Sequence, residues 1–445
     1  MARLSPTPGA LPERLDPVFG DPLLDRLFPR LATGVHFGLD RMRRAVSELG
    51  DPHVAYPTIH VGGTNGKGSV TATVGSILRA HGRRVGCYTS PHLRSFCERI
   101  LIDGRPIAEE AVLRYADEIR DTVEGLGMPF FEATTLLAMH AFAREGVGVG
   151  VMEVGLGGRL DATNVVDPRV TAVTNVAMDH AEYLGDTLPL IAREKAGIMK
   201  PGVPFVTAET SEEIVALFRR LAADVGAPIT VVPEEAAGEV EVTRDHTSLR
   251  VRTEAWGELD LRTPLVGRHQ SINAALSVAV VERLADDLRP DAEAVVRGIA
   301  DVVHPGRDEV LTRDGHTWLF DVAHNVAGIH SLVDTIDRLE LARPLVALVG
   351  VQGDKDWRSM LPALFSRMDA AILTQPPTVP AERRWDPAAV ADEVEALTVV
   401  RVVPDFVDAV SKAKERAEGG TVVVTGSVHT VGSTMSLLGV DPYGR

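Results

Sequence analysis

A strand-like run that ends in a glycine loop constrains the fold of this chain more than any other feature. Residues 56–70 read YPTIHVGGTNGKGSV, and residues 70–80 then show the apolar spacing of a helix. Glycines let a backbone turn sharply and direct successive N–H groups at one point. The N-terminus of the following helix adds its positive dipole at the same place. The order strand, glycine loop, lysine, helix therefore predicts a phosphate-binding loop.

The loop departs from the usual pattern G-x-x-x-x-G-K-[ST] in two places. Counting back from Gly66 and Lys67, the first glycine would fall at Val61, and Ser69 comes one residue late. A glycine loop of this kind is also found as a turn that binds no ligand. The rest of the chain has to decide between a phosphate site and a plain turn.

The composition narrows the class of protein. A chain of 445 residues is long enough for two or three domains, and its net charge of −16 argues against a nucleic-acid partner. The two cysteines, Cys87 and Cys97, are too few to staple a protein of this size, which favours a reducing compartment. Apolar runs are too short to span a membrane. We therefore expect a cytoplasmic protein, acting as a monomer, without nucleic-acid or membrane partners.

Strands and helices alternate from about residue 33, which is typical of a parallel sheet covered by helices. The predicted strands are residues 58–61, 84–89, 148–154, 170–176 and about 204–207. The predicted helices are residues 39–49, 69–81, 109–125, 131–145, 188–196 and 212–225.

The pattern changes near residue 228 and again near residue 304. Short alternating runs at 230–232, 240–243, 247–253 and 257–262 predict a small antiparallel appendage, followed by helices at 270–287 and 290–299. A second α/β alternation follows, with predicted strands at 317–320, 345–351, 370–373, 397–403 and 421–425.

The predicted fold class is α/β in two main parts. A loosely ordered extension, 1–30, precedes a phosphate-loop-type parallel-sheet ATPase domain, 31–302, which carries the small antiparallel appendage. A Rossmann-like α/β domain, 303–445, completes the chain.

Three polar residues join the glycine loop at the predicted carboxyl ends of parallel strands. Ser90, Glu153 and His180 each follow one of these strands, and that edge of an open α/β sheet is where ligands bind. A hydroxyl, a carboxylate and an imidazole suit magnesium or manganese beside phosphate oxygens. The alternative is that each residue only caps a helix or satisfies its own loop.

Other candidates have simple structural alternatives. Lys195 falls at a predicted helix end, where a solvated lysine is favoured by the helix dipole. Asp321 follows a strand of the second domain and could hold ribose hydroxyls, while Arg307 could reach phosphate. His324 could act near the chemistry or serve only its loop.

Specific motifs resemble one known family over residues 33–432. They are Gly63-Thr64-Asn65-Gly66-Lys67-Gly68-Ser69, Ser90-Pro91-His92-Leu93, EVGLGGRLDATN, Asp179-His180 with LGDTLPLIAREKAGIMKPGVP, Gly267-Arg268-His269-Gln270 with Asn273, Pro305-Gly306-Arg307, and DVAHN. The chain resembles the folylpolyglutamate synthase and dihydrofolate synthase family of the Mur-ligase superfamily. The loop is then the Mur-type variant G-T-x-G-K-G-S, which accounts for its departure from the usual pattern.

The resemblance implies an ATP-dependent amide ligase of folate and one-carbon metabolism. A carboxylate of dihydropteroate or a folate would attack the γ-phosphate of ATP, and the amine of L-glutamate would displace phosphate from the acyl phosphate. Two other hypotheses stay open: a related Mur-type ligase acting on another carboxylate, and a nucleotide-binding regulator without catalytic activity.

The resemblance also assigns residues, which fall into four groups. The ATP contacts would be Thr64, Asn65, Gly66, Lys67, Gly68, Ser69, Asn273, Arg307 and Asp321. The ligands of Mg²⁺ would be Ser90, Glu153, His180 and a carbamylated Lys195. The catalytic residues would be Lys67, Lys195, His324 and Asp161, with Asp161 near the pteroate group. The substrate contacts would be His36, Phe37, Gly38, Leu39, Phe131, Glu132, Leu160, Asp161, Ala162, Arg99 and Ser427. Of these, Arg99 and Ser427 would face glutamate, together with the catalytic residue His324.

The sequence departs from the family pattern D-G-A-H-N-P. Val322 and Val326 replace its glycine and proline, and His36 stands where an acidic residue is frequent.

Overall fold

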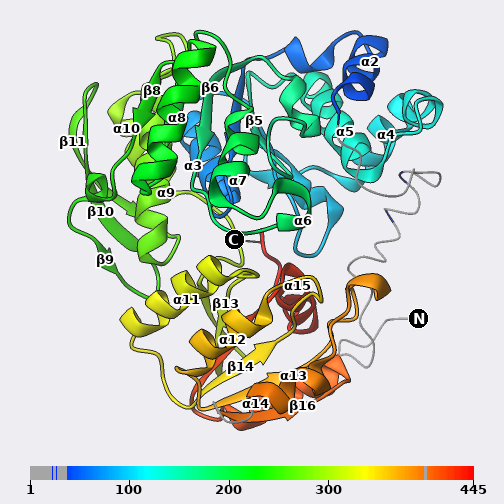
Figure 1. Cartoon of the computed structure of the whole chain (residues 1–445), viewed down its shortest axis with the longest axis vertical. Coiled ribbons are helices and arrows are strands. Elements are labelled where there is room, and N and C mark those ends of the chain that lie inside the picture. The colour runs from blue at the N-terminus through cyan, green and yellow to red at the C-terminus, as the bar shows by residue number, and fades with distance from the viewer. Residues whose placement is uncertain (1–22, 24–26, 28–37, 395–397, 445) are drawn as a thin grey trace, which may run out of the picture. The chain divides into compact units, whose positions relative to one another are not determined.

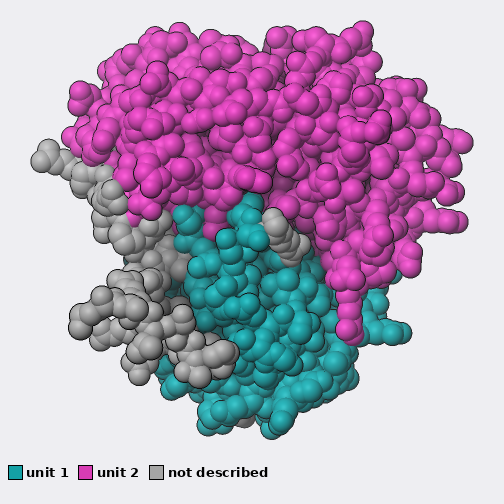
Figure 2. Space-filling model, turned by 180° about the vertical axis from the view of Figure 1, so that it is seen from behind, with its two compact units in different colours: residues 1–21, 93–95, 305–445 teal, residues 22–92, 96–304 magenta. Residues whose placement is uncertain are grey.

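The computed structural model describes residues 23, 27, 38–394 and 398–444. It divides into two compact units, coloured separately in Figure 2. The N-terminal unit holds the described residues of Pro22–His92 and Phe96–His304, and the C-terminal unit holds those of Pro305–Arg445 together with Leu93–Ser95. The predicted extension 1–30 lies outside the described residues except for Leu23 and Leu27.

The large sheet of the N-terminal unit has eight strands in the described residues (Figure 1). Their order is β4-β3-β2-β5-β1-β6-β7-β8. Their bounds are β1 (Thr58–Gly62), β2 (Val85–Tyr88), β3 (Ile100–Ile102), β4 (Arg105–Pro106), β5 (Val149–Glu153), β6 (Pro168–Val173), β7 (Phe205–Thr207) and β8 (Ile229–Val231). All neighbours from β2 to β8 are parallel, which confirms the predicted parallel sheet.

The strands β3 and β4 were not predicted, and they extend one edge as an antiparallel hairpin. Their two-residue turn is Asp103-Gly104, and both residues have positive φ, at 52° and 78°. Asp-Gly is a typical pair for such a turn, so the sequence contained a signal for this hairpin.

Helices surround this sheet. Their bounds are α2 (Asp40–Glu48), α3 (Lys67–Ala80), α4 (Glu109–Gly125), α5 (Phe130–Arg144), α6 (Ala181–Leu184), α7 (Leu188–Ala196), α8 (Glu212–Val225), α9 (Arg268–Glu282) and α10 (Ala292–Ala300), with 3₁₀ turns at Pro52–Val54, Phe96–Arg99, Ala162–Val165 and Glu234–Ala237. The helix α3 is buried nearly all round because it packs between the sheet and the helices α9 and α10. Among the described residues, no helix combines the length and the apolar character needed to cross a membrane.

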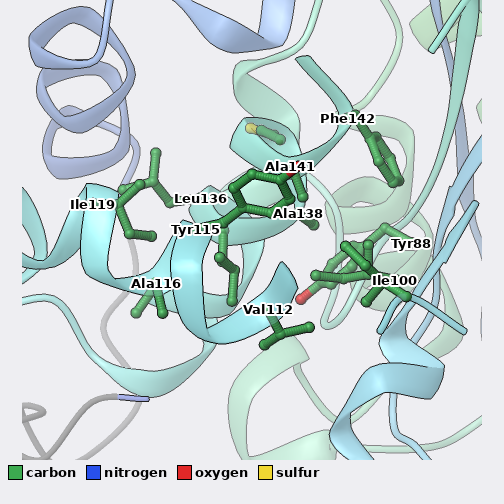
Figure 3. Close-up of a cluster of buried hydrophobic side chains, with 14 of the residues drawn as sticks. Tyr88, Ile100, Val112, Tyr115, Ala116, Ile119, Leu136, Ala138, Ala141 and Phe142 are labelled. Carbon is green, nitrogen blue, oxygen red and sulfur yellow. The ribbon is translucent and has the colours of Figure 1, made fainter. Parts of the chain in front are cut away.

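A hydrophobic cluster covers the side of the strand β2 that faces away from α3 (Figure 3). Tyr88 of β2 and Ile100 of β3 meet Val112 and Tyr115 of α4, together with Phe142 of α5. The buried residues of α4 recur every three or four positions, as expected for an amphipathic helix with one face on a core.

The predicted antiparallel appendage is confirmed, with one correction. It consists of β9 (Glu241–Val242), β10 (Thr247–Thr253) and β11 (Gly257–Thr263) in the order β11-β10-β9. Assigning residues 230–232 to it was wrong, because β8 pairs in parallel with β7 and ends the large sheet. A three-residue strand carries no local information about its partner, since pairing is set by distant residues.

In its described residues, the C-terminal unit has a six-stranded sheet in the order β12-β13-β17-β14-β15-β16. Its strands are β12 (Glu309–Arg313), β13 (His316–Phe320), β14 (Leu345–Val349), β15 (Ala370–Leu373), β16 (Val399–Val402) and β17 (Thr421–Thr425). Its helices are α11 (Val326–Arg338), α12 (Trp357–Phe365), α13 (Pro387–Val394), α14 (Phe406–Arg416) and α15 (Val428–Leu437), with a 3₁₀ turn at Ala381–Arg383. Among the described strands of this sheet, only β12 is antiparallel to its neighbour.

Alternate residues of β14 belong to different hydrophobic cores. Ala347 and Val349 pack with residues of α11, α12 and α13, whereas Val346 and Leu348 pack with residues of α14 and α15. Since successive side chains of a strand point to opposite faces, the sheet is covered on both sides. The predicted Rossmann-like class of this part is confirmed.

Candidate active site

Four loops of the N-terminal unit leave the same edge of the sheet. They follow β2, β5, β1 and β6, which are consecutive and parallel in the sheet. Ser90 comes two residues after β2, Glu153 is the last residue of β5, and the glycine loop follows β1. His180 lies in the loop between β6 and α6. The topology therefore places Ser90, Glu153, His180 and the predicted phosphate loop on one edge.

Two glycines of the loop are required by its geometry. Gly66 has φ of 83° and immediately precedes α3, and a Cβ there would lie 2.5 Å from Oδ1 of Asn273. Gly63 has φ of 136°, and a Cβ there would overlap the side chain of Thr174. Asn273, a predicted ATP contact, thus borders the phosphate loop from α9.

The loop after β6 holds the glycine loop in shape. The backbone N–H of Thr64 donates to the carbonyl of Asn175 at 2.9 Å, and that of Asn65 donates to Oδ1 of Asn175 at 3.0 Å. The hydroxyl of Thr174 donates to the carbonyl of Asn65 at 2.6 Å. Lys67 Nζ donates to the carbonyl of Thr64 at 3.0 Å, which keeps the ammonium over the loop. Sequence reasoning assigned no role to Thr174 and Asn175, although both stand in a stretch that follows a strand.

Ser69 has a buried hydroxyl that forms no hydrogen bond within the described residues. Leaving such a group without a partner costs roughly 1–3 kcal/mol, and this hydroxyl lies in the first turn of α3, where helix amides are also free to bind an anion. Glu153 is buried too, and its Oε2 accepts from the N–H of Ser90 at 3.1 Å. The unsatisfied hydroxyl beside a glycine loop fits a ligand composed of phosphate and a hard cation.

His304 is a residue near this site that sequence reasoning missed. A Cβ at Gly68 would lie 2.5 Å from Nε2 of His304 and 3.6 Å from Oε2 of Glu153. The imidazole therefore borders the start of α3. No local pattern marks His304, since it stands alone before the Pro-Gly pair.

Lys195 is buried in the helix α7, with 4% of its surface exposed. Its Nζ donates to the carbonyl of Gly63 at 2.9 Å. Burial, reinforced by the positive charge of Lys67, lowers the pKa of Lys195 to about 7. The alternative of a solvated cation at a helix end is therefore wrong, because the side chain points into the protein beneath the phosphate loop.

His180 immediately precedes the short helix α6, with a positive φ of 51°. Its Nε2 lies 3.9 Å from Oδ1 of Asp179. The described residues contain no cluster of three or more His, Cys, Asp or Glu side chains suited to a metal. A cation at this edge would thus need hydroxyl, water and phosphate oxygens, and the convergence of His180 with Glu153 on one ion stays a prediction.

Asp161 is buried, and its carboxylate organises the loop after β5. It accepts from the N–H of Leu156 at 2.8 Å, from the N–H of Thr163 at 3.0 Å and from the hydroxyl of Thr163. The same hydroxyl lies 2.8 Å from Nε2 of His60, which is fully buried in β1. Burial raises the pKa of Asp161. This chain of contacts fixes the loop that carries Leu160 and Ala162.

Arg99 is buried with an aromatic neighbour. Its Nε donates to Nδ1 of His92 at 2.9 Å, and its guanidinium lies 5.4 Å from the ring centre of Phe130. Glu132, in the first turn of α5, is buried, and its Oε2 lies 3.4 Å from Nε of Arg41. Arg99 and Glu132 are thus held in a polar and aromatic region around the start of α5.

Three of the remaining predicted substrate contacts lie at or just before the N-terminus of a helix. Phe131 lies against Gly155, where a Cβ would overlap its ring. Gly38 and Leu39 immediately precede α2. His36 and Phe37 lie outside the described residues, so their predicted roles stay predictions.

In the C-terminal unit, Asp321 and Ser427 follow the neighbouring strands β13 and β17. Ser427 caps α15, and its hydroxyl donates to the carbonyl of Gly350 at 2.8 Å. His324 follows Asp321 by three residues, and its Nδ1 donates to the carbonyl of Val322 at 2.9 Å. Asp321, His324 and Ser427 thus lie at one edge of this sheet, and their proposed roles stay predictions.

The two valines that depart from the family pattern have structural roles. Val322 is buried in the core with Trp318 and Phe320. Val326 is the first residue of α11, whose cap is Asn325. Proline is favoured at a first helical position but not required there, so the helix starts in the same way with valine.

Comparisons with known proteins agree with this geometry. Residues 61–281 match the Mur ligase middle domain, and residues 306–428 match the Mur ligase, glutamate ligase domain. The dihydrofolate synthase/folylpolyglutamate synthase of Mycobacterium tuberculosis is 34% identical over 94% of this chain and 93% of its own length. The probable bifunctional folylpolyglutamate synthase/dihydropteroate synthase of Haloferax volcanii is 35% identical over 88% of this chain, which spans only 47% of that relative.

Two solved structures have the same fold. Mycobacterium tuberculosis folylpolyglutamate synthase complexed with ADP has a TM-score of 0.85 at 33% identity, covering 95% of this chain and all of its own. The Escherichia coli protein in complex with DHPP and ADP has a TM-score of 0.81 at 30% identity, covering 95% of this chain and 98% of its own. The chain therefore belongs to the folylpolyglutamate synthase/dihydrofolate synthase family of Mur ligases.

Proposed function

We propose that this chain is an ATP-dependent amide ligase that joins L-glutamate to dihydropteroate or to a folate through an acyl phosphate. The observation that carries the proposal is that two polar side chains, Lys195 and Ser69, are buried next to the glycine loop. The same loop holds the ammonium group of Lys67 through a hydrogen bond to its backbone. Relatives named for this activity have been solved with ADP, and one of them also with DHPP.

The phosphate loop supplies the positive charge that the reaction requires. Transfer of the γ-phosphoryl group to a carboxylate brings two anions together, so the site must supply positive charge where they meet. Lys67, the amides of the first turn of α3 and the helix dipole supply it. Asn273 lies against Gly66 of the same loop, in keeping with a nucleotide contact.

The residues at this edge also fit magnesium. Ser69 offers a buried hydroxyl without a hydrogen bond in the described part of the chain, and Glu153 offers a buried carboxylate. Ser90 and His180 complete the proposed ligand set. When bound, Mg²⁺ would offset the negative charge of the phosphate oxygens.

A carbamylated Lys195 would extend this ligand set. A lysine reacts with carbon dioxide only as a neutral amine, and a pKa of about 7 leaves much of Lys195 neutral at physiological pH. The product would be an anion with oxygen donors, placed close to Lys67. The hydrogen bond from Nζ to Gly63 shows that the side chain reaches the loop without rearrangement.

The assignments on the substrate side rest on the family pattern. Asp161 is proposed near the pteroate group, and its contacts with Leu156 and Thr163 mean that it also fixes the loop. Arg99, His324 and Ser427 are proposed to face glutamate. Arg307 and Asp321 are proposed to contact ATP. The cytoplasmic location and the monomeric state stay predictions.

The test is a glutamate-dependent ADP-release assay with the full chain. Dihydropteroate and tetrahydrofolate would be offered separately, with and without L-glutamate, and products would be detected by mass. We expect ADP release only when ATP, glutamate and one of these carboxylates are all present, with one glutamate residue gained by the product. The variant Lys67→Ala is the matched control for contaminating ATPases.

Each of the other hypotheses predicts a different result. ADP binding without any glutamate-dependent turnover would favour a non-catalytic nucleotide-binding regulator. Turnover with another carboxylate, and none with either pterin compound, would favour a related ligase with a different substrate.

A further inference from the structure

A buried histidine in the middle of the N-terminal sheet is joined by hydrogen bonds to the predicted substrate loop. His60 lies in β1, between the strands β5 and β6, and it is fully buried. Burying a polar side chain costs free energy unless its hydrogen bonds are satisfied. An apolar residue would fill this strand position without that cost, so packing alone does not account for a histidine here.

The hydrogen bonds run from His60 through Thr163 to Asp161. Nε2 of His60 lies 2.8 Å from the hydroxyl oxygen of Thr163, and the same hydroxyl is hydrogen-bonded to Oδ1 of Asp161. The backbone N–H of Thr163 donates to this Oδ1 at 3.0 Å. Thr163 therefore holds one oxygen of Asp161 by two hydrogen bonds, and His60 contacts Thr163 from the central strand.

The direction of these hydrogen bonds follows from their partners. Both oxygens of Asp161 accept backbone N–H groups, Oδ2 from Leu156 and Oδ1 from Thr163, as an ionised carboxylate does. The single hydroxyl hydrogen of Thr163 is therefore directed to Asp161, and the hydroxyl oxygen accepts from His60. Nε2 of His60 accordingly carries a hydrogen.

The other ring nitrogen of His60 leads to the same tautomer. Nδ1 forms no hydrogen bond within the described residues. A hydrogen on Nδ1 would be a buried donor without an acceptor, which is more costly than a hydrogen on Nε2. Burial, and next the positive charge of Lys200, lower the pKa of His60 to about 3, so the ring is neutral at physiological pH.

We propose that His60 is a positioning residue, which donates from Nε2 to Thr163 so that Thr163 orients the carboxylate of Asp161 towards the bound dihydropteroate or folate. A hydrogen bond donated to a hydroxyl oxygen strengthens the one that the hydroxyl itself donates. His60 therefore acts on Asp161 through Thr163. The inference rests on the proposed function in one respect, namely that Asp161 lies near the pteroate group.

Other contacts fix the end of the same loop without His60. The amide Nδ2 of Asn164 donates to the carbonyls of Arg159 and Gly197, each at 3.0 Å. The carbonyl of Asn164 accepts from Lys200 Nζ at 3.2 Å. Removing the imidazole should therefore leave the loop in place and affect mainly the orientation of the carboxylate.

The substitution His60→Leu removes the donor and fills the space with an apolar side chain. His60→Gln is the matched control, because a glutamine amide can donate from close to the place of Nε2. Binding would be measured by calorimetry on the full chain. Dihydropteroate would be titrated with ADP present, and ADP would be titrated alone.

We expect His60→Leu to bind dihydropteroate roughly threefold to tenfold more weakly than the wild type, as one lost hydrogen bond would produce. His60→Gln should recover most of this loss, and the ADP affinity of both variants should be unchanged. Thr163→Val should weaken dihydropteroate binding at least as much as His60→Leu. Adding His60→Leu to Thr163→Val should then cause little further loss, because the two residues act in one chain.

A second measurement needs neither ligand nor turnover. Nitrogen NMR of isotope-labelled histidine rings distinguishes a ring nitrogen that carries a hydrogen from one that does not. The signals of His60 are those that disappear in His60→Gln. At neutral pH, we expect a hydrogen on Nε2 of His60 and none on Nδ1.

Three results would overturn the proposal. They are a hydrogen on Nδ1 of His60, equal dihydropteroate affinities of the wild type and His60→Leu, and parallel losses of dihydropteroate and ADP affinity in His60→Leu, which would indicate a purely structural role. A wild type that binds neither dihydropteroate nor tetrahydrofolate would refute the pteroate assignment of Asp161 and this proposal with it. Binding of dihydropteroate with the expected losses, but without glutamate-dependent turnover, would count against the ligase function alone.

Discussion

Replacing Lys195 with methionine should remove a strong pH dependence from the stability of this protein. Lys195 lies beneath the phosphate loop with 4% of its surface exposed. Burial, and then the neighbouring charge of Lys67, lower its pKa from 10.5 to about 7. Methionine has a similar length and no charge, so it fills the same space without the desolvation cost.

The magnitude follows from the two pKa values. Each pH unit between folded and unfolded pKa corresponds to about 1.4 kcal/mol, so the folded state disfavours the charged amine by about 5 kcal/mol. Because the unfolded chain binds this proton more tightly, the cost is greatest below about pH 7 and disappears as the pH rises towards 10.5. Between about pH 7 and about pH 9, the wild type should gain about 2 kcal/mol of unfolding free energy relative to Lys195→Met.

The measurement is urea denaturation of both proteins in buffers freed of carbon dioxide. Added bicarbonate should then stabilise the wild type alone if the neutral amine forms a carbamate. In the activity assay, Lys195→Ala should lose most turnover and regain part of it with acetate, which can replace the lost carboxylate-like oxygens. Lys195→Arg should stay inactive, because a guanidinium group does not become neutral near pH 7.

Parallel stability curves for the wild type and Lys195→Met would refute the depressed pKa. An active Lys195→Arg enzyme would refute the carbamate while leaving the pKa argument intact. The two results are separable because the first concerns a proton and the second a covalent modification.

Three further predictions concern the same sheet edge. Lys67→Ala should abolish ATP turnover with little change in the thermal unfolding midpoint, since Nζ contacts only loop backbone among the described residues; near wild-type turnover would contradict the phosphate-loop assignment. Glu153→Gln should raise the magnesium concentration needed for half-maximal activity, because an amide keeps the contact to Ser90 but loses the charge, and an unchanged magnesium titration would remove Glu153 from the metal site. Gly66→Ala should destabilise the protein by about 1–2 kcal/mol and weaken ADP binding, as measured by denaturation and calorimetry, because φ is 83° and Asn273 occupies the space; unchanged values of both would contradict this geometry.

Local patterns were sufficient for most helices and strands. The helix over residues 212–225 and the strand over residues 421–425 are found with the bounds that the sequence predicts. Both have an apolar pattern of the right period, bounded by polar or glycine residues, so their identity depends on neighbours in the chain. The two hairpins at Asp103-Gly104 and Asp314-Gly315 were missed, although an Asp-Gly pair is a local sequence signal for a two-residue turn. In the structure, both residues of each turn have a positive φ.

The placement of β8 could not be obtained in this way. Its three residues are predicted as a strand at almost the same position, but their partner is β7 and not the antiparallel appendage. A strand pairs with whatever backbone the rest of the fold brings alongside, and that information is absent from the strand itself.

The sequence by itself determined that a glycine loop with Lys67 and Ser69 follows a strand, and that Ser90, Glu153 and His180 follow other strands. In a parallel sheet these positions must share an edge, so their grouping is a consequence of topology. Only the tertiary structure decided the electrostatic state of the side chains. Lys195 has a pKa of about 7 because distant segments bury it beside Lys67. Protonation depends on solvent access and on charges brought from elsewhere in the chain, which no local pattern records.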